Sequence, residues 1–151
     1  MTDRSKITRL EDLKNLQKTD IVDLGDFDNG VSLIVEMKKP SLMSMIRKKE
    51  IPNPLMKSAI SLFSKGVGTF ITESMSDEKS ISKFADLIEF FCEECFVTPK
   101  YSEIKELGIE LTDEQLNAVL FYTQGGLTAL ENFRKIFGNL EGNNSSSDIQ
   151  D

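Results

Sequence analysis

The sequence predicts a mainly α fold, a compact helical domain of five or six helices with a small N-terminal β-hairpin. Three observations support this prediction. Residues 111–137 follow a capping-box sequence with apolar side chains spaced three or four positions apart. Residues 77–96 carry a wider apolar arc, and residues 20–37 hold two β-rich runs around Asn29-Gly30. Because the strands are confined to one hairpin, the fold is α+β only at the margin.

The chain divides into three parts. Residues 1–19 form a polar N-terminal arm with a short helical piece, whose apolar positions are Ile7, Leu10, Leu13 and Leu16. Residues 20–137 form a single domain. Residues 138–151 are expected to be a disordered polar tail, because Gly, Asn, Ser and Asp leave little to bury.

Turn and capping residues separate the elements that follow the hairpin. Ser41 caps a short helix over residues 42–49, and Asn53 is expected to cap a helix that runs to about Lys65. Residues 66–77 are either a loop or a weak helix. The helix over residues 77–96 is the most buried one, and a short helix at 101–107 follows it.

Four residues are expected to shape the last helix. Thr112 and Gln115 form a reciprocal capping box, in which each side chain bonds the other residue's backbone N–H. Gly125 and Gly126 interrupt the apolar stripe without changing its phase, which predicts one continuous helix. Two glycines each cost roughly 1 kcal/mol relative to alanine, so we expect either a kink or a close helix contact there.

The charge is unevenly distributed along the chain. The net charge of −7 divides into −3 over residues 1–37, +6 over 38–65 and −10 over 66–151. The basic band is a solvated face, a partner surface or an intramolecular complement to the acidic part of the chain. The chain has no apolar run long enough for a membrane span and no secretory signal, and its two cysteines make no disulfide framework. We therefore expect an intracellular protein.

The sequence offers little for catalysis. It contains no histidine, and no phosphate-binding glycine-rich loop is present. Cys92 and Cys95 lie within an apolar helical stripe without two further ligands, so we interpret them as packing residues. We expect no catalytic residue, no metal and no cofactor, and the protein is not predicted to be an enzyme.

A methionine-rich segment is the main candidate for partner binding. Methionine side chains adapt to several packings, although they also fill cores, and both interpretations remain open for this segment. The candidate partner-binding residues are Met43, Met45, Ile46, Arg47, Lys48 and Met56.

Several ordered features resemble one known family. They are Lys39-Pro40-Ser41-Leu42, Ile51-Pro52-Asn53-Pro54-Leu55, Phe96-Val97-x-Pro99, Leu111-Thr112-Asp113-Glu114-Gln115, Gln124-Gly125-Gly126-Leu127, Leu130 and Phe133. Together these features resemble the tail assembly chaperones encoded by long-tailed phages and prophages of Gram-positive bacteria. The resemblance covers about residues 20–137.

The resemblance implies a non-enzymatic role in the cytoplasm of the bacterial host. Such a chaperone binds the tape measure protein, keeps it soluble and presents it for tail-tube polymerisation. Further partners implied by the resemblance are tail-tube subunits and a longer, frameshifted form of the protein itself, and a homo-oligomer remains open. A membrane is not expected among the partners.

The alternative is a small helical interaction or regulatory protein, DNA-associated through residues 38–65. Pro52 and Pro54 stand where a helix-turn-helix usually has a tight glycine turn, and the net charge opposes DNA binding. The chaperone is therefore the favoured interpretation.

Overall fold

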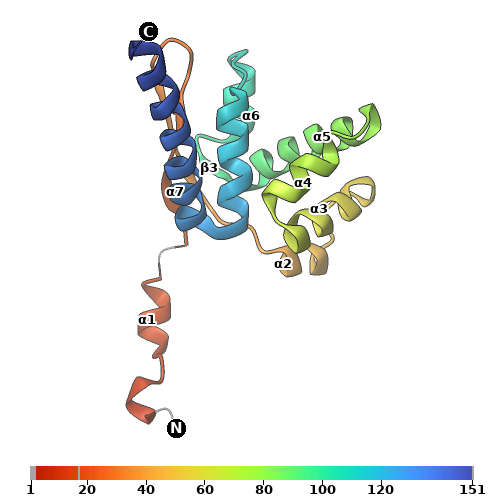
Figure 1. Ribbon diagram of the computed structural model, residues 1–151. Helices are drawn as coiled ribbons and strands as arrows, with labels where there is room; N and C mark the ends of the chain where they lie inside the picture. The colour runs from red at the N-terminus through yellow and green to blue at the C-terminus, as the bar shows by residue number, and fades with distance from the viewer. Residues whose placement is uncertain (1–2, 17, 151) are drawn as a thin grey trace.

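The computed structural model describes the backbone of residues 3–16 and 18–150, and the side chains as far as Lys135. This part of the chain contains seven α-helices, one 3-10 turn and a three-stranded antiparallel sheet. The predicted mainly α fold with a small N-terminal hairpin is therefore confirmed. Figure 1 shows the sheet on one side of α7 (Asp113–Gln150), with α3 (Asn53–Lys65), α4 (Val67–Ser74) and α5 (Glu78–Cys95) on the other side.

The N-terminal arm holds a 3-10 turn at Arg4–Lys6 and α1 at Leu10–Lys14. At the start of α1, the Arg9 N–H donates to the Asp12 carboxylate at 3.4 Å. Figure 1 shows the arm extending away from the rest of the molecule. Its four apolar side chains are exposed, from 46% for Leu13 to 76% for Leu10. We call Ile7, Leu10, Leu13 and Leu16 the arm stripe.

The strands β1 (Asp20–Asp26) and β2 (Ser32–Met37) form the predicted hairpin, with Val22 opposite Val35. A third strand, β3 (Phe96–Thr98), pairs antiparallel with β2 and completes the sheet. The sequence interpretation had placed Phe96 at the end of a helix. A strand of three residues is too short for its alternation to be distinguished from the apolar helix before it.

One face of the hairpin packs against α7. Val22, Leu24, Val35 and Met37 are at most 2% exposed, whereas Ile21 and Ile34 on the opposite face are 67% and 56% exposed. Because side chains alternate between the two faces of a strand, one face of the hairpin lies in the core and the other faces solvent.

Two buried polar side chains of α7 fasten it to the hairpin. Gln115 donates its amide N–H to the Gly25 carbonyl at 3.1 Å. The Tyr122 hydroxyl donates to the Asp20 carboxylate at 2.7 Å, and it also lies 3.3 Å from the Met37 carbonyl. Burial and the hydrogen bond to Asp20 raise the pKa of Tyr122. Among the residues whose side chains the structure describes, no buried side-chain nitrogen or oxygen atom lacks a hydrogen-bond partner, as burial requires.

The first two helices after the hairpin begin at a polar cap and at prolines, respectively. Ser41 caps α2 (Leu42–Arg47) by accepting from the Ser44 N–H at 3.3 Å. The helix α3 begins at Asn53 itself, one residue before the predicted start, with a proline in its first turn. Gly66 ends α3 at φ 86°, and the ambiguous segment after it contains α4.

The helix α5 is the predicted long, buried helix. Its cap is Asp77, whose carboxylate accepts from the Ser80 N–H at 2.8 Å, and this bond lowers the pKa of Asp77. Its fully or nearly buried residues are Leu87, Ile88, Phe90, Phe91, Cys92 and Cys95. The short helix α6 (Tyr101–Glu106) follows β3.

The capping box at the start of α7 is confirmed. The Gln115 N–H donates to the Thr112 hydroxyl at 3.1 Å, and the Thr112 N–H donates to the Gln115 side-chain oxygen at 2.9 Å. Thr112 and Gln115 therefore have the structural role predicted for them.

The prediction of one continuous helix through Gly125 and Gly126 is wrong. Both residues leave the helical region, at φ −151°, ψ 15° and φ 65°, ψ −148°. Figure 1 shows the chain reversing there, so α7 is a hairpin of two helical halves. The rings of Phe121 and Phe133 stack at 4.3 Å across it, whereas a straight helix would hold two residues twelve positions apart at about 18 Å.

The predicted kink is therefore present, but the predicted close helix contact at Gly126 is not. The nearest atom to a Cβ at Gly126 would be Lys39 Cδ at 3.8 Å, which is an ordinary contact. Gly126 is required by its positive φ, which side chains rarely adopt.

The C-terminal end also differs from the prediction. Residues 138–151 were expected to be disordered, yet the backbone of α7 continues as helix to Gln150, and Asp151 lies outside the described residues. Each residue added to an existing helix gains a hydrogen bond without a new nucleation step. Polar composition alone therefore did not end this helix.

Candidate partner-binding surfaces

Four of the six predicted partner-binding residues lie on the surface at α2. Met43 is 68% exposed and Ile46 is 36% exposed, while Arg47 and Lys48 point into solvent beside them in the chain. We call Met43, Ile46, Arg47 and Lys48 the α2 surface. Two apolar side chains beside two cations suit an amphipathic segment with acidic flanks.

The other two predicted residues belong to the interior. Met45 is only 4% exposed and lies in the core, and Met56 is half-buried against it. Residues 43 and 45 are about 200° apart around a helix of 3.6 residues per turn, so they face opposite sides. Met45 is therefore removed from the candidate surface, and Met56 contributes mainly to packing.

A small hollow of about 190 Å³ lies next to the α2 surface. Its charged lining residues are three lysines, Lys38, Lys39 and Lys48, and two glutamates, Glu50 and Glu94. This mixture of signs gives the hollow no strong preference for an anion. The α2 surface itself is thus the more specific feature of this region.

The sequence interpretation missed a second surface, a groove among α4, α5, α6 and α7. The groove has a volume of about 460 Å³, and more of its exposed lining is apolar than polar. We call it the α5 groove. Its lining residues are Ile71, Met75, Ile81, Phe84, Ala85, Ile88, Glu89, Tyr101, Asp113, Leu116 and Asn117.

The α5 groove has apolar walls and an acidic margin. Met75 and Ile81 are 49% and 41% exposed, and Phe84 is anchored against Phe70 at a ring distance of 5.6 Å. The charged residues among those that line it are Glu89 and Asp113, both acidic. Glu89 also forms an ion pair with Lys105 of α6.

The sequence does contain a signal for this groove, an apolar helical stripe, but such a stripe fits a buried core face as well as an exposed groove. Ile81, Phe84, Ala85 and Ile88 follow the spacing of a helical stripe, which we had assigned wholly to the core. Only Ile88 of these four is buried in the structure. Periodicity identifies an apolar face, but it does not show whether a neighbouring helix covers the whole of that face.

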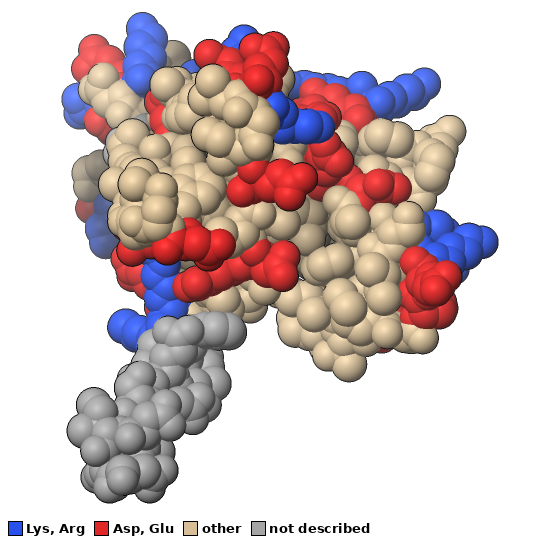
Figure 2. Space-filling model, turned by 90° about the horizontal axis from the view of Figure 1, so that it is seen from above, with Lys and Arg blue, Asp and Glu red and all other residues tan. Residues whose placement is uncertain are grey.

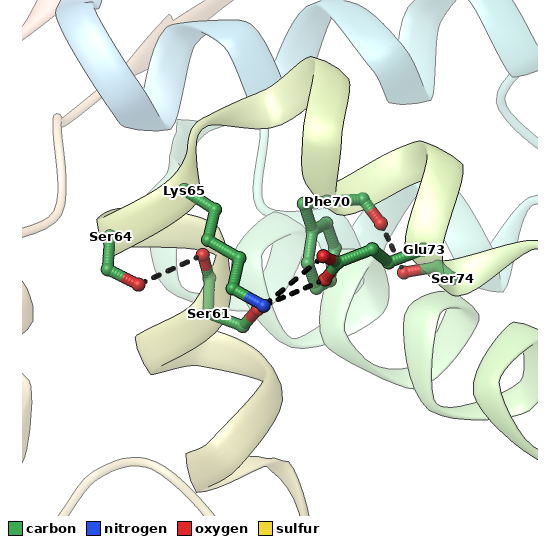
Figure 3. A network of polar contacts seen from close by, with 6 residues as sticks. All are labelled: Ser61, Ser64, Lys65, Phe70, Glu73 and Ser74. Carbon is green, nitrogen blue, oxygen red and sulfur yellow. Dashed lines mark hydrogen bonds and ion pairs between the residues drawn. The ribbon is translucent and has the colours of Figure 1, made fainter.

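The helix α4 forms one wall of the α5 groove, and contacts around the turn between α3 and α4 hold it in place (Figure 3). Lys65 at the end of α3 contacts both carboxylate oxygens of Glu73 on α4, at 3.2 and 3.1 Å. On α4, the buried Ser74 hydroxyl donates to the Phe70 carbonyl at 2.7 Å. Because Lys65 and Glu73 are each half-exposed, their ion pair contributes at most about 1 kcal/mol. Packing therefore holds this corner more than charge does.

The two cysteines are free thiols buried in α5, at 0% exposure each. Burial raises the pKa of both thiols, that of Cys95 to about 12. A protonated, enclosed thiol is a poor nucleophile and a poor metal ligand. Within the described residues, no group of three His, Cys, Asp or Glu side chains is placed to hold a metal ion.

Acidic side chains dominate one face of the molecule. Figure 2 shows them running across the middle of that face, with basic side chains mostly toward its edges. This distribution agrees with the net charge of −10 over residues 66–151. Like-charged copies repel one another across such a face, which favours solubility.

No protein-family model, no curated protein and no solved structure matches this chain. None of the helices in the described ranges combines the length and apolar character needed to cross a membrane.

Proposed function

We propose that this protein is a tail assembly chaperone that binds the tape measure protein, keeps it soluble and presents it for tail-tube polymerisation. The α2 surface is the observation that carries the proposal. Met43 and Ile46 are left exposed on a short helix whose other face, at Met45, is anchored in the core. An anchored helix that presents a flexible methionine beside an isoleucine suits a partner with many similar but non-identical apolar segments.

The physical requirements of the proposed task agree with this surface. A tape measure protein is long and helical, and its apolar stretches aggregate when they are uncovered. An apolar helix face can be covered by a complementary apolar surface on the chaperone. Arg47 and Lys48 add contacts to acidic flanks, and the acidic remainder of the chain keeps the complex soluble. Modest affinity at each site is sufficient when many copies bind along one chain.

We expect a very long reading frame, encoding the tape measure protein, immediately downstream of the gene for this chain, and the test is co-expression of the two proteins. We expect the unaltered chain to keep the tape measure protein in the soluble fraction. Met43→Ser with Ile46→Ser should remove most of that effect, because both side chains are exposed and their loss leaves the core intact. Leu107→Ser is the matched control, since Leu107 is 75% exposed and lies outside both candidate surfaces.

Circular dichroism must show that both variants remain folded. If the α2 double variant solubilises the tape measure protein as well as the Leu107→Ser control does, the α2 surface is not the binding site. If the unaltered chain has no effect on solubility, the chaperone proposal itself fails.

The second candidate is a DNA-associated regulatory protein. This candidate rests on the seven basic side chains of residues 38–65, all of which are exposed: Lys38, Lys39, Arg47, Lys48, Lys49, Lys57 and Lys65. A gel-shift assay with random duplex DNA at low salt separates the two candidates. The chaperone proposal predicts no shift. A shift that Arg47→Gln with Lys48→Gln abolishes would favour the DNA-associated protein instead.

A further inference from the structure

The chain carries two apolar surfaces that do not cover each other. One is the arm stripe, whose members are between 46% and 76% exposed. The other is the α5 groove, with a volume of about 460 Å³. Figure 1 shows the arm leaving the molecule from the sheet side, while α4 and α5 lie on the other side of the N-terminal half of α7. Both surfaces therefore remain without an apolar partner inside this copy.

We propose that the N-terminal arm of one copy docks in the α5 groove of a second copy, so that the chain associates head to tail. The groove is concave and largely apolar, as a site for an inserted helix must be. The arm supplies a short helix with Leu10 and Leu13 on one side. Exposed leucines on a projecting helix gain most by entering such a groove.

The charges of the two surfaces are complementary. Arg9 precedes α1, and Lys14 ends it on the same side as Leu10, because residues four apart share a helix face. Glu11 and Asp12 point away from the two leucines, each about 130° around the helix from the midpoint between Leu10 and Leu13. The charged residues that line the groove, Glu89 and Asp113, are acidic, and Glu89 already pairs with Lys105, so Asp113 is the carboxylate left for a cation of the arm. An arm inserted through its leucines thus brings cations toward Asp113 and keeps its own carboxylates outside.

The outer face of the hairpin is a weaker candidate for the arm. Ile21 and Ile34 are exposed there, but Asp23 and Glu36 share the strand pairs with them on a sheet surface. The groove offers concave burial, whereas this face offers two apolar side chains, each opposite a carboxylate. Ile34 is therefore useful as a control position.

Head-to-tail docking has a specific consequence for assembly. Two different patches on one chain generate a heterologous contact, which closes into a ring or continues as an open array. This inference does not depend on the tape measure protein, because it concerns only copies of this chain.

The test measures the mass of the full chain by sedimentation velocity over a range of concentrations. Wild-type protein should associate as its concentration rises. Leu10→Glu with Leu13→Glu disrupts the helical part of the arm stripe, and Ile81→Glu blocks the groove. All three positions are at least 41% exposed, so the variants should fold. Each variant alone should be monomeric, and Ile34→Glu, at a position 56% exposed, should associate like the wild type.

Mixing the two variants gives the decisive result. The arm variant keeps an intact groove and the groove variant keeps an intact arm, so an equimolar mixture should form a 1:1 heterodimer and nothing larger. A wild type that remains monomeric, including one whose arm folds onto its own groove, overturns the proposal. The proposal is also overturned if the arm variant or the groove variant still associates on its own. A mixture of the two variants that forms no heterodimer overturns it as well.

Discussion

Gly125 and Gly126 are adjacent, but they are needed for different physical reasons. A side chain at Gly126 would have ordinary space around it, with Lys39 Cδ at 3.8 Å, but its backbone has a φ of 65° and a ψ of −148°. A Cβ at Gly125 would lie 2.7 Å from the Cβ of Ala129, which is too close for any pair of carbon atoms. One glycine is therefore required by its conformation and the other by a contact.

Alanine at the two positions should distinguish these causes. Gly126→Ala should lower the free energy of unfolding by about 1–3 kcal/mol through backbone strain. Gly125→Ala should cost about the same through overpacking against Ala129. Both costs are measurable by urea unfolding at one temperature.

The control is the same pair of substitutions in an Ala129→Gly background. Removing the methyl group at residue 129 should recover most of the Gly125→Ala loss and none of the Gly126→Ala loss. Equal recovery at both positions would show that a shared contact, rather than the φ of Gly126, sets the cost.

At the scale of elements, α7 acts as two helices that pack on each other. Its first half carries the capping box and the polar contacts to β1, and its second half returns beside it. The stacked rings of Phe121 and Phe133 join the halves. Because the chain reverses at the two glycines, the apolar side chains before them and those after them can pack into the same core.

A double-mutant cycle on Phe121→Leu and Phe133→Leu tests this packing. Stacked rings are worth about 0.5–1.5 kcal/mol beyond their burial, so the two losses should be non-additive by that amount. A straight helix would hold the two residues about 18 Å apart and give additive losses. Urea unfolding of the two single variants and the double variant provides the measurement. Purely additive losses would therefore contradict the hairpin.

The elements were predictable where a local signal had one interpretation. Thr112 and Gln115 fix the start of α7, Asp77 precedes a long apolar stripe, and Ser41 caps α2 as expected. The β3 strand and the reversal in α7 were not predictable in the same way. Both depend on distant partners, namely β2 for Phe96 and the facing half of α7 for Phe133.

The candidate surfaces were predicted only in part, for the same reason. The sequence identified the methionine-rich segment, but the burial of Met45 depends on which face of α2 meets the core. The α5 groove was missed because Ile81 and Phe84 fit a core stripe equally well. Whether an apolar residue is covered is a property of the tertiary packing and not of local periodicity.

At the scale of the whole molecule, the buried thiols connect stability to pH. Burial raises the pKa of Cys92 and Cys95 above the ordinary value of a thiol, so both stay protonated in the fold under alkaline conditions. The unfolded chain ionises its thiols from about pH 9. A group whose folded pKa is raised loses its stabilising contribution as the pH rises past the unfolded value.

The free energy of unfolding should therefore fall between pH 8 and pH 10, by about 1.4 kcal/mol for each buried thiol. The double variant Cys92→Ala, Cys95→Ala should show a correspondingly shallower decline, although it starts from a lower stability. Urea unfolding at pH 7, 8, 9 and 10 compares the two proteins. Parallel declines in both would show that other groups, such as Tyr122, account for the whole effect.

The contacts between α7 and β1 also set an order of events during synthesis. Gln115 bonds a carbonyl 90 positions earlier in the chain, and Tyr122 bonds a side chain 102 positions earlier. At about 5–20 residues per second, the hairpin leaves the ribosome several seconds before the helix that covers it. During that interval the face of Val22 and Val35 is open to any apolar segment nearby. The strands of the hairpin are thus covered only when a helix about 90 residues further along the chain has been synthesised.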